Sequence, residues 1–352
     1  MFRECCSAFG DGLGSLPDGE VGDRRNWIEY LALRTFAAHP QLEEVRRPRG
    51  GRIPVLPDQV VAPGEAQDLE GLVWHFRVRP GVTELEFADL HYAEAAVHSY
   101  ERFARLRDSG VVPAHVRFQA GFPGSSSAIE EYFCEPEDWP LAKSAYEAAV
   151  RQQIAAMLEA IPAGDLAVQF DFSNEVVDLS RGAGRTQPWL PEQSFEEKWE
   201  RHTASLSELG RCIPDETLLG FHWCYGTWGG WPRTEMADLG LCVRLTNDAV
   251  ARAGRRVDYV HMPVVRDPDE SFFAPLRELD AGPRIFLGLI HHDDHRPDGL
   301  ARRLALAHAH LDDFGIGGPC GYGRVSSAEL PAVMRAHRDG LNEMRRVRAT
   351  AS

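Results

Sequence analysis

The sequence contains no long apolar run, and nowhere do 18 apolar residues follow one another. A helix that crosses a bilayer needs about that length, so we expect no transmembrane segment and no membrane partner. The first residues, MFRECCSAFGDGLG, include Glu4 and no apolar stretch of seven or more, which is not typical of a secretory signal peptide.

Positive charge is also scarce. Lys and Arg together number 38 against 53 for Asp and Glu, which gives a formal net charge of −15. Such a chain repels phosphate backbones and anionic lipid surfaces. We therefore expect no nucleic-acid partner.

Cysteine is infrequent, and its number is odd. The seven cysteines among 352 residues form no regular framework, which argues against a disulfide scaffold and for a reducing compartment. The sequence thus predicts a cytoplasmic protein. It is also compatible with a homo-oligomer.

The composition, with 43% hydrophobic and 26% charged residues, is typical of a folded globular protein. From about residue 116 the chain repeats a short apolar run, a loop and an amphipathic helix. The predicted strands cover residues 115–122, 166–172, 218–224, 257–262, 285–291 and 314–320. The predicted helices between them cover residues 141–161, 195–209, 236–253 and 300–311. This alternation indicates parallel strands joined by crossover helices.

The part before residue 116 is less regular. Residues 13–20 fit one more strand, and residues 92–109 fit a helix. Residues 46–80 are rich in Pro, Gly and Arg, with β-forming residues at 72–78, and we interpret them as a loop or hairpin insertion. Seven strands result, one fewer than a closed (β/α)8 barrel needs. The first strand therefore either precedes Met1 or escapes the pattern.

A doubly wound open sheet is the alternative α/β architecture. It usually carries a loop of the GxGxxG or GxxxxGK[ST] type, and neither pattern follows any predicted strand. We therefore predict a single TIM-type barrel domain over residues 1–352. Ser326 and Glu329 have the spacing of a capping box that opens a last helix, and we expect residues 342–352 to form a flexible tail.

Potential metal ligands lie at the ends of the predicted strands. His222 and Cys224 are two residues apart on one strand, so both side chains leave from the same face. His261 and Cys320 close two other strands, and the carboxyl ends of all barrel strands meet at one mouth. Thiolates and imidazoles are ligands that Zn²⁺ prefers, so this set predicts a zinc site. The alternative is that the cysteines are small buried hydrophobic residues.

Three segments in this order, LGFHWCYG, YVHMP and GGPCGYGR, resemble the zinc-site motifs of the cobalamin-independent methionine synthases. The same superfamily includes epoxyalkane:coenzyme M transferase and uroporphyrinogen decarboxylase, and the similarity spans residues 13–341. It implies that His222, Cys224 and Cys320 are zinc ligands and that Asp171, in VQFDFSNEV, binds substrate. The chain departs from the family where those synthases place a glutamate ligand, because His261 is the best match there.

The resemblance implies a zinc-dependent thiol alkyltransferase that acts on a small-molecule thiol and an alkyl donor. Zinc would bind the thiol, lower its pKa so that the thiolate exists near neutral pH, and present it to an electrophilic carbon. An open coordination position is then required, and His261 is either a displaceable fourth ligand or an acid near the leaving group. A metal-independent lyase like uroporphyrinogen decarboxylase and a non-catalytic metal-binding barrel are the alternatives.

The segment LIHHDDHR lies at another strand end and contains His292 and Asp293. We expect these two residues to transfer protons, because strand-end loops of barrels carry catalytic groups. The alternatives are a network that orients the zinc ligands, a solvated loop, and a separate hydrolytic metal site.

Two acids and two arginines follow the first predicted strand, namely Asp18, Glu20, Arg24 and Arg25. They fit a site for an amino or carboxylate group of the substrate, or a surface ion-pair network. The segment FPGSSS, residues 122–127, either donates hydrogen bonds to a substrate oxyanion or forms a turn. Trp223, Trp228 and Trp231 fit an apolar substrate wall, although core packing explains them equally well.

Overall fold

The computed structural model describes residues 1–18, 24, 28–47, 74–185, 190–227, 231–280, 282–296, 298–323 and 325–351. Among these residues, no helix has the length and apolar character needed to cross a membrane.

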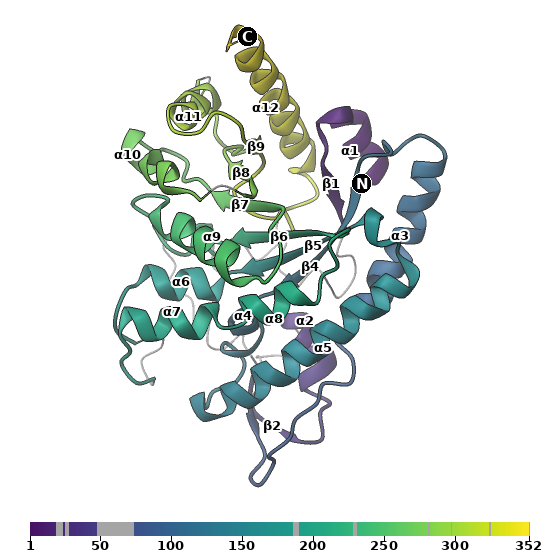
Figure 1. The fold of residues 1–352 in the computed structure, drawn as a ribbon, viewed down its shortest axis with the longest axis vertical. Helices are drawn as coiled ribbons and strands as arrows, with labels where there is room; N and C mark the ends of the chain where they lie inside the picture. The colour runs from purple at the N-terminus through teal and green to yellow at the C-terminus, as the bar shows by residue number, and fades with distance from the viewer. Residues whose placement is uncertain are drawn as a thin grey trace.

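Seven parallel strands form the central sheet, and helices surround it (Figure 1). The strands, in their order across the sheet, are β1 (Ser15–Pro17), β4 (Arg117–Pro123), β5 (Leu166–Phe172), β6 (Leu218–Trp223), β7 (Tyr259–Pro263), β8 (Arg284–Gly288) and β9 (Gly315–Ile316). Each strand pairs in parallel with the next. The sheet curls into a TIM-like half-barrel, which confirms the predicted α/β fold class.

Helices follow most of the strands. They are α1 (Phe2–Phe9), α2 (Glu29–Leu31), α3 (Tyr92–Asp108), α4 (Ser125–Ile129), α5 (Trp139–Ala160), α6 (Asn174–Ser180), α7 (Phe195–Thr203), α8 (Leu206–Arg211), α9 (Gly240–Arg252), α10 (Glu270–Phe273), α11 (Gly299–His308) and α12 (Leu330–Ala351). The start of α7 has a local cause, because Ser194 and Glu197 form a complete capping box. The predicted helix 195–209 is divided into α7 and α8, which are separated by a turn.

The two faces of the sheet have different chemistry because side chains alternate along each strand. Phe118 packs against Tyr100 and Phe103 of α3, so this face of β4 meets the helices. Phe170 and Phe221 are register partners on the same face of β5 and β6, and their ring centroids lie 6.0 Å apart. The strand residues that alternate with them, such as Gln169, Asp171 and His222, point to the inner face, which is polar and carries the site described below.

The sheet has seven strands in the described part of the chain, not the eight of a closed barrel. β1 pairs directly with β4, and the intervening chain forms a separate antiparallel hairpin of β2 (Leu42–Arg46) and β3 (His75–Val78). The hairpin confirms the expected insertion, whose residues 48–73 lie outside the described ranges.

Helix α12 packs against β9 and against the turn that precedes β1. A Cβ atom at Gly340 would lie 3.2 Å from Cδ1 of Ile316 in β9, and one at Gly12 would lie 2.8 Å from Leu341. The capping pair that precedes the helix is present, since Ser326 Oγ donates to Glu329 Oε2 at 2.8 Å. We expected a tail from residue 342, but the helix continues to Ala351.

The last strand is shorter than predicted. β9 covers only Gly315 and Ile316, whereas the apolar pattern extends over residues 314–320. Gly317, Gly318 and Pro319 follow, and a proline cannot donate to the ladder. The chain leaves the sheet there and brings Cys320 over the end of the barrel strands.

Candidate metal centre

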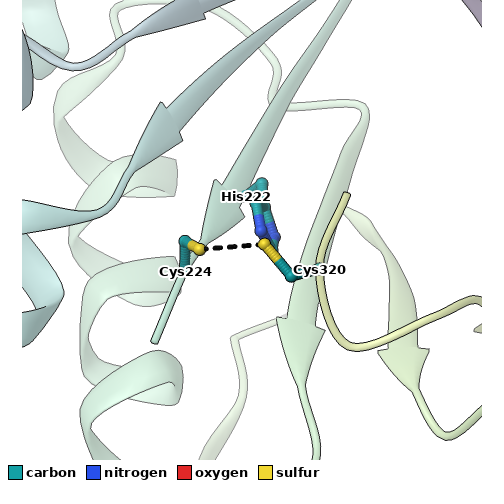
Figure 2. Close-up of side chains that lie close together, drawn as sticks. All are labelled: His222, Cys224 and Cys320. Carbon is teal, nitrogen blue, oxygen red and sulfur yellow. Dashed lines mark hydrogen bonds between the residues drawn. The ribbon is translucent and has the colours of Figure 1, made fainter. Parts of the chain in front are cut away.

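Three potential metal ligands come together at the carboxyl ends of the strands (Figure 2). His222 lies near the end of β6, Cys224 follows that strand, and Cys320 is in the loop after β9. The two sulfur atoms are 3.2 Å apart. One ligand atom from each residue lies within 4.8 Å of the other two. The structure therefore assembles three of the four predicted metal ligands from segments almost 100 residues apart.

His261 contacts this group through His222. The two imidazole rings stack with centroids 4.6 Å apart, and their Nδ1 atoms are 2.8 Å from each other. One Nδ1 must carry the proton of this hydrogen bond and the other must accept it. His261 is not part of the three-residue group whose ligand atoms lie within 4.8 Å of one another.

The Nε2 atoms of both histidines are buried and have no hydrogen-bond partner in the described structure. A buried polar atom without a partner costs free energy. The side chain of His222, held through Nδ1, thus keeps one nitrogen for another ligand. Metal-bound histidines commonly have this arrangement, in which the second nitrogen is fixed by a neighbour.

The register of the sheet aligns the polar residues of the site across neighbouring strands. Asp171 in β5 is the register partner of His222, and His222 is the partner of His261 in β7. In a parallel sheet, paired residues project from the same face. The carboxylate and the two imidazoles therefore form one row across three strands on the inner face.

Asp171 is held by a chain of hydrogen bonds that crosses the inside of the barrel. Ser15 Oγ donates to Gln119 Oε1 at 2.7 Å, and Gln119 Nε2 donates to Gln169 Oε1 at 3.3 Å. Gln169 Nε2 then donates to Asp171 Oδ1 at 2.7 Å. The chain connects β1, β4 and β5 and fixes one carboxylate oxygen of Asp171.

The buried charges of the centre are coupled. The hydrogen bond from Cys320, together with the His222 cation, holds the pKa of the Cys224 thiol well below its usual range. The same hydrogen bond, together with burial, raises the pKa of Cys320 well above its usual range. Burial opposes protonation of His222, but the Cys224 thiolate and Asp171 outweigh it and raise the pKa of His222 to about 9.

Burial raises the pKa of Asp171 to about 6. Burial and the neighbouring His222 lower the pKa of His261 well below its usual range. A thiol with a lowered pKa and an imidazole with a raised pKa thus lie close together in a buried place. A divalent cation bound by these groups would compete with their protons.

The predicted proton-transfer residues differ in position. His292 is 17% exposed and lies beside Tyr322, with ring centroids 5.7 Å apart, and Tyr322 follows Cys320 by two residues. Asp293 is half-exposed and forms an ion pair with Arg266. His292 therefore borders the metal centre, whereas Asp293 lies in a surface ion pair.

The alternative of a second metal site in the segment LIHHDDHR has no support in the described ranges. Asp294 is held by Arg296 and Arg303, both cations. His291 Nε2 lies 3.0 Å from the carbonyl oxygen of Val264. Within those ranges, His222, Cys224 and Cys320 form the one group of three ligand-type side chains close enough to share an ion.

The residues after β1 are described in part. Asp18 and Arg24 form an ion pair of 2.6 Å with both side chains largely buried. Glu20 and Arg25 lie outside the described residues. The pair fits either prediction, a substrate site or an ion-pair network.

The serines of FPGSSS are buried and hydrogen-bonded to the helices behind them. Ser125 bonds to Glu147, Ser126 to Lys143 and His202, and Ser127 to Glu175. Their hydroxyls are engaged in packing, so the oxyanion interpretation is wrong for these side chains.

The three tryptophans do not share a location that the structure can describe. Trp223 is buried toward the helices, where Nε1 donates to Thr246 Oγ1 at 2.9 Å. Trp231 lies against His291, with ring centroids 5.3 Å apart. Trp228 lies outside the described residues. Trp223 is thus a core residue, as the alternative interpretation has it.

Sequence reasoning missed two tyrosines next to the centre. Tyr259 precedes His261 by two residues on the same face of β7, and its ring covers Gly220, where a Cβ atom would lie 2.1 Å from the ring. Tyr322 covers Gly318 in the same way, with its hydroxyl 1.9 Å from an added Cβ. Both hydroxyls are buried and have no hydrogen-bond partner in the described structure. A glycine in a strand opposite an aromatic residue was the signal that could have indicated Tyr259.

Known structures share this fold. A B12-independent methionine synthase from Shewanella sp. W3-18-1, in complex with selenomethionine, matches with a TM-score of 0.63 at 14% identity, over 99% of this chain and 86% of that chain. A putative vitamin-B12-independent methionine synthase from Listeria monocytogenes matches with a TM-score of 0.51 at 14% identity, over 77% of this chain and 73% of that chain. No protein-family model and no curated protein matches the chain. The resemblance predicted from the three motifs is confirmed at the level of the fold.

Proposed function

We propose that this protein is a zinc-dependent thiol alkyltransferase, which transfers a methyl or another small alkyl group to a zinc-activated substrate thiol. The observation that carries the proposal is the group of His222, Cys224 and Cys320 at the carboxyl ends of β6 and β9. The fold shared with a B12-independent methionine synthase supports it. The substrates would be a small-molecule thiol and a small-molecule alkyl donor.

The residues present fit a zinc ion. Two sulfur atoms and one imidazole form a donor set that Zn²⁺ prefers, and three protein ligands leave a fourth position open for substrate. The unpartnered, buried Nε2 of His222 is a further point of agreement. When bound, zinc would supply the positive charge that keeps a substrate thiol deprotonated near neutral pH.

The other residues of the site would bind and orient. The chain from Ser15 through Gln119 and Gln169 fixes one oxygen of Asp171, which leaves the other oxygen to accept from a donor group of the substrate. His261 would hold Nδ1 of His222 and so orient its Nε2. His292, beside Tyr322 and partly exposed, would move a proton between the site and solvent.

Zinc counting tests the proposal. We expect about one zinc per chain in the wild-type protein and none in Cys224→Ser or Cys320→Ser, because each substitution removes a thiolate ligand. Cys212→Ser is the matched control, since Cys212 lies at the end of α8 and bonds to the carbonyl oxygen of Leu209. It should keep its zinc.

Alkyl transfer is measured next, with a panel of thiols and methyl donors and the same variants. Turnover should depend on zinc and disappear in both ligand variants. A wild-type protein that takes up no zinc under reducing conditions would overturn the proposal. In that case a metal-independent reaction that uses Asp171 would be the next hypothesis.

A further inference from the structure

We propose a second binding site on the outside of the barrel, which takes a small organic anion with a flat apolar body, such as an aromatic carboxylate. The site is a groove between the first turn of α5, residues 190–193 and Arg201 of α7. We call it the α5–α7 groove. None of its described lining residues belongs to the metal centre, and Figure 1 shows α7 in the outer layer of helices, away from β9.

The groove has the size and walls of a small-molecule site. Its volume is about 310 Å³, and pockets for small ligands start near that volume. Among the described residues, three prolines, Trp139 and Leu190 form the apolar part of the lining. Trp139 and Leu190 are buried, so they form a fixed base rather than a mobile surface. Flat indole and proline rings are suited to contact an aromatic ring.

The charged groups in the described lining of the groove are both cations, Lys143 and Arg201, and the remaining polar group is Gln193. This is a local reversal of the chain's composition, in which acids outnumber bases by 53 to 38. The nearest acid in the lining segment, Glu192, is exposed and faces Arg185 at 3.8 Å. The charge of the lining therefore favours an anion.

The two cations are held rigidly by groups behind them. Lys143 Nζ donates to Ser126 Oγ at 2.8 Å and to Glu130, and the Arg201 guanidinium bonds to Glu130 and to Asp178. The guanidinium also lies over the Trp139 ring, 5.3 Å from its centroid. Both side chains are 14% exposed. Because both side chains are already ordered, ligand binding would cost little of their conformational entropy.

The carboxylates that pair with these cations lie behind them. Lys143 pairs with Glu130, and Arg201 pairs with Glu130 and Asp178. Neither Glu130 nor Asp178 belongs to the described lining of the groove. The two cations are therefore the charged groups of the described lining that a ligand would meet first.

Benzoate is the probe that tests the site, with benzamide as the uncharged molecule of the same shape. We expect one benzoate to bind per chain, measured by calorimetry and by ligand-observed NMR, and benzamide to bind at least tenfold more weakly. The proposal is overturned if benzoate shows no saturable binding, or if both molecules bind equally.

A charge series at Gln193 separates the groove from other surfaces. The backbone of Gln193 is fixed by hydrogen bonds with Gly184 of 2.8 and 3.2 Å, so its side chain can change without loss of that contact. Gln193→Glu should weaken benzoate at least tenfold, and Gln193→Lys should strengthen it, because the substitutions change only the charge that faces the ligand. Zinc content should stay the same in both variants. Equal benzoate affinity across the series would place the binding elsewhere and overturn the proposal.

Discussion

Two buried polar clusters in this protein differ in how completely their polar atoms are paired. The outer network between α4, α6 and α7 satisfies its carboxylates: Asp178 accepts from Lys198, Arg201 and His202 at 2.7 to 2.9 Å. The inner cluster at the strand ends leaves the Nε2 atoms of His222 and His261 and the hydroxyls of Tyr259 and Tyr322 unpaired in the described structure. Burial of polar groups is therefore common to both, and the inner cluster differs in that imidazole and hydroxyl groups, rather than ion-paired carboxylates, make up its buried polar atoms.

The difference indicates different roles. A paired network can stabilise the fold with its own groups, whereas buried atoms without partners cost free energy in the absence of a ligand. Proteins keep buried polar atoms of this kind where a metal, a water molecule or a substrate serves as their bonding partner. We therefore expect substitutions in the outer network to lower the stability of the fold. Substitutions in the inner cluster should change metal binding and leave the stability of the metal-free protein almost unchanged.

The largest effect on stability is expected from breaking the outer network at Lys198. This side chain is fully buried and its Nζ donates to Asp178 Oδ1 at 2.8 Å. Lys198→Met should lower the free energy of unfolding by about 3 kcal/mol, because it leaves a buried carboxylate short of one cation. Urea unfolding measures the change.

Arg77→Gln is the control for Lys198→Met, since Arg77 forms an ion pair with Glu43 that is exposed to solvent. Exposed ion pairs contribute little, so no measurable loss is expected there. If Lys198→Met were as stable as the wild type, the outer network would not be structural and the comparison would fail.

The pH dependence of stability also tests whether the outer network stabilises the fold. Burial opposes ionisation of Glu130, but Lys143, His202 and Arg201 outweigh it and lower its pKa from 4.5 to about 2. A group whose pKa is lowered in the folded state contributes stability above its unfolded pKa and loses it as the pH falls toward the folded value. The contribution, about 3 kcal/mol at pH 7, should therefore disappear between pH 4.5 and about 2.

Urea unfolding of wild type and Glu130→Gln at pH 7 and pH 3 checks this prediction. The two proteins should differ most at pH 7 and much less at pH 3, because the wild-type carboxylate loses its advantage as the unfolded chain binds protons. A difference that stays constant with pH would contradict the assigned role of Glu130.

The sequence predicted the inner cluster better than the outer network, for a physical reason. His222 and Cys224 lie two residues apart in an apolar run, and polar residues at strand ends stand out against such a background. Asp178, Lys198 and His202 lie on helices, where polar residues at helical spacing usually face solvent, although all three are buried here. A single sequence cannot distinguish a solvated helix face from a buried ionic network.

The pairing register of the strands and the course of the loops could not be predicted from the sequence either. The motifs placed His222 and His261 near strand ends, but only the pairing of β5, β6 and β7 puts Asp171 in the same row. The expected role of His261 as a zinc ligand stays a prediction, since its Nδ1 meets His222 in this structure. Glycines and a proline shortened β9, which an apolar pattern alone does not show.

Removing the contact between His261 and His222 should change metal binding more than folding. His261→Phe keeps the stacked ring and removes Nδ1, and we expect zinc affinity to fall by about 10- to 100-fold, as for residues that orient a metal ligand. Competition with a chelator measures the affinity, and urea unfolding of the metal-free protein is the control. An unchanged affinity would contradict the positioning role, and a much greater loss would make His261 a ligand itself.

The smallest effects come from two buried tyrosines, and their signs should differ. Tyr146 belongs to the packed part of the molecule, and its hydroxyl donates to the carbonyl oxygen of Pro123 at 2.8 Å. Tyr259 belongs to the inner cluster, where its buried hydroxyl has no partner among the described residues. Tyr146→Phe should lower the free energy of unfolding of the metal-free protein by about 1 kcal/mol, because a carbonyl loses its donor.

Tyr259→Phe should leave the stability of the metal-free protein unchanged or raise it by up to about 1 kcal/mol, because it removes a hydroxyl that is buried without compensation. Parallel urea unfolding curves measure both variants, and their m-values should match that of the wild type. If Tyr259→Phe lost as much stability as Tyr146→Phe, the hydroxyl of Tyr259 would have a partner within the fold. The inner cluster would then be as self-sufficient as the outer network, and unpaired atoms would no longer mark it as the place where a ligand binds.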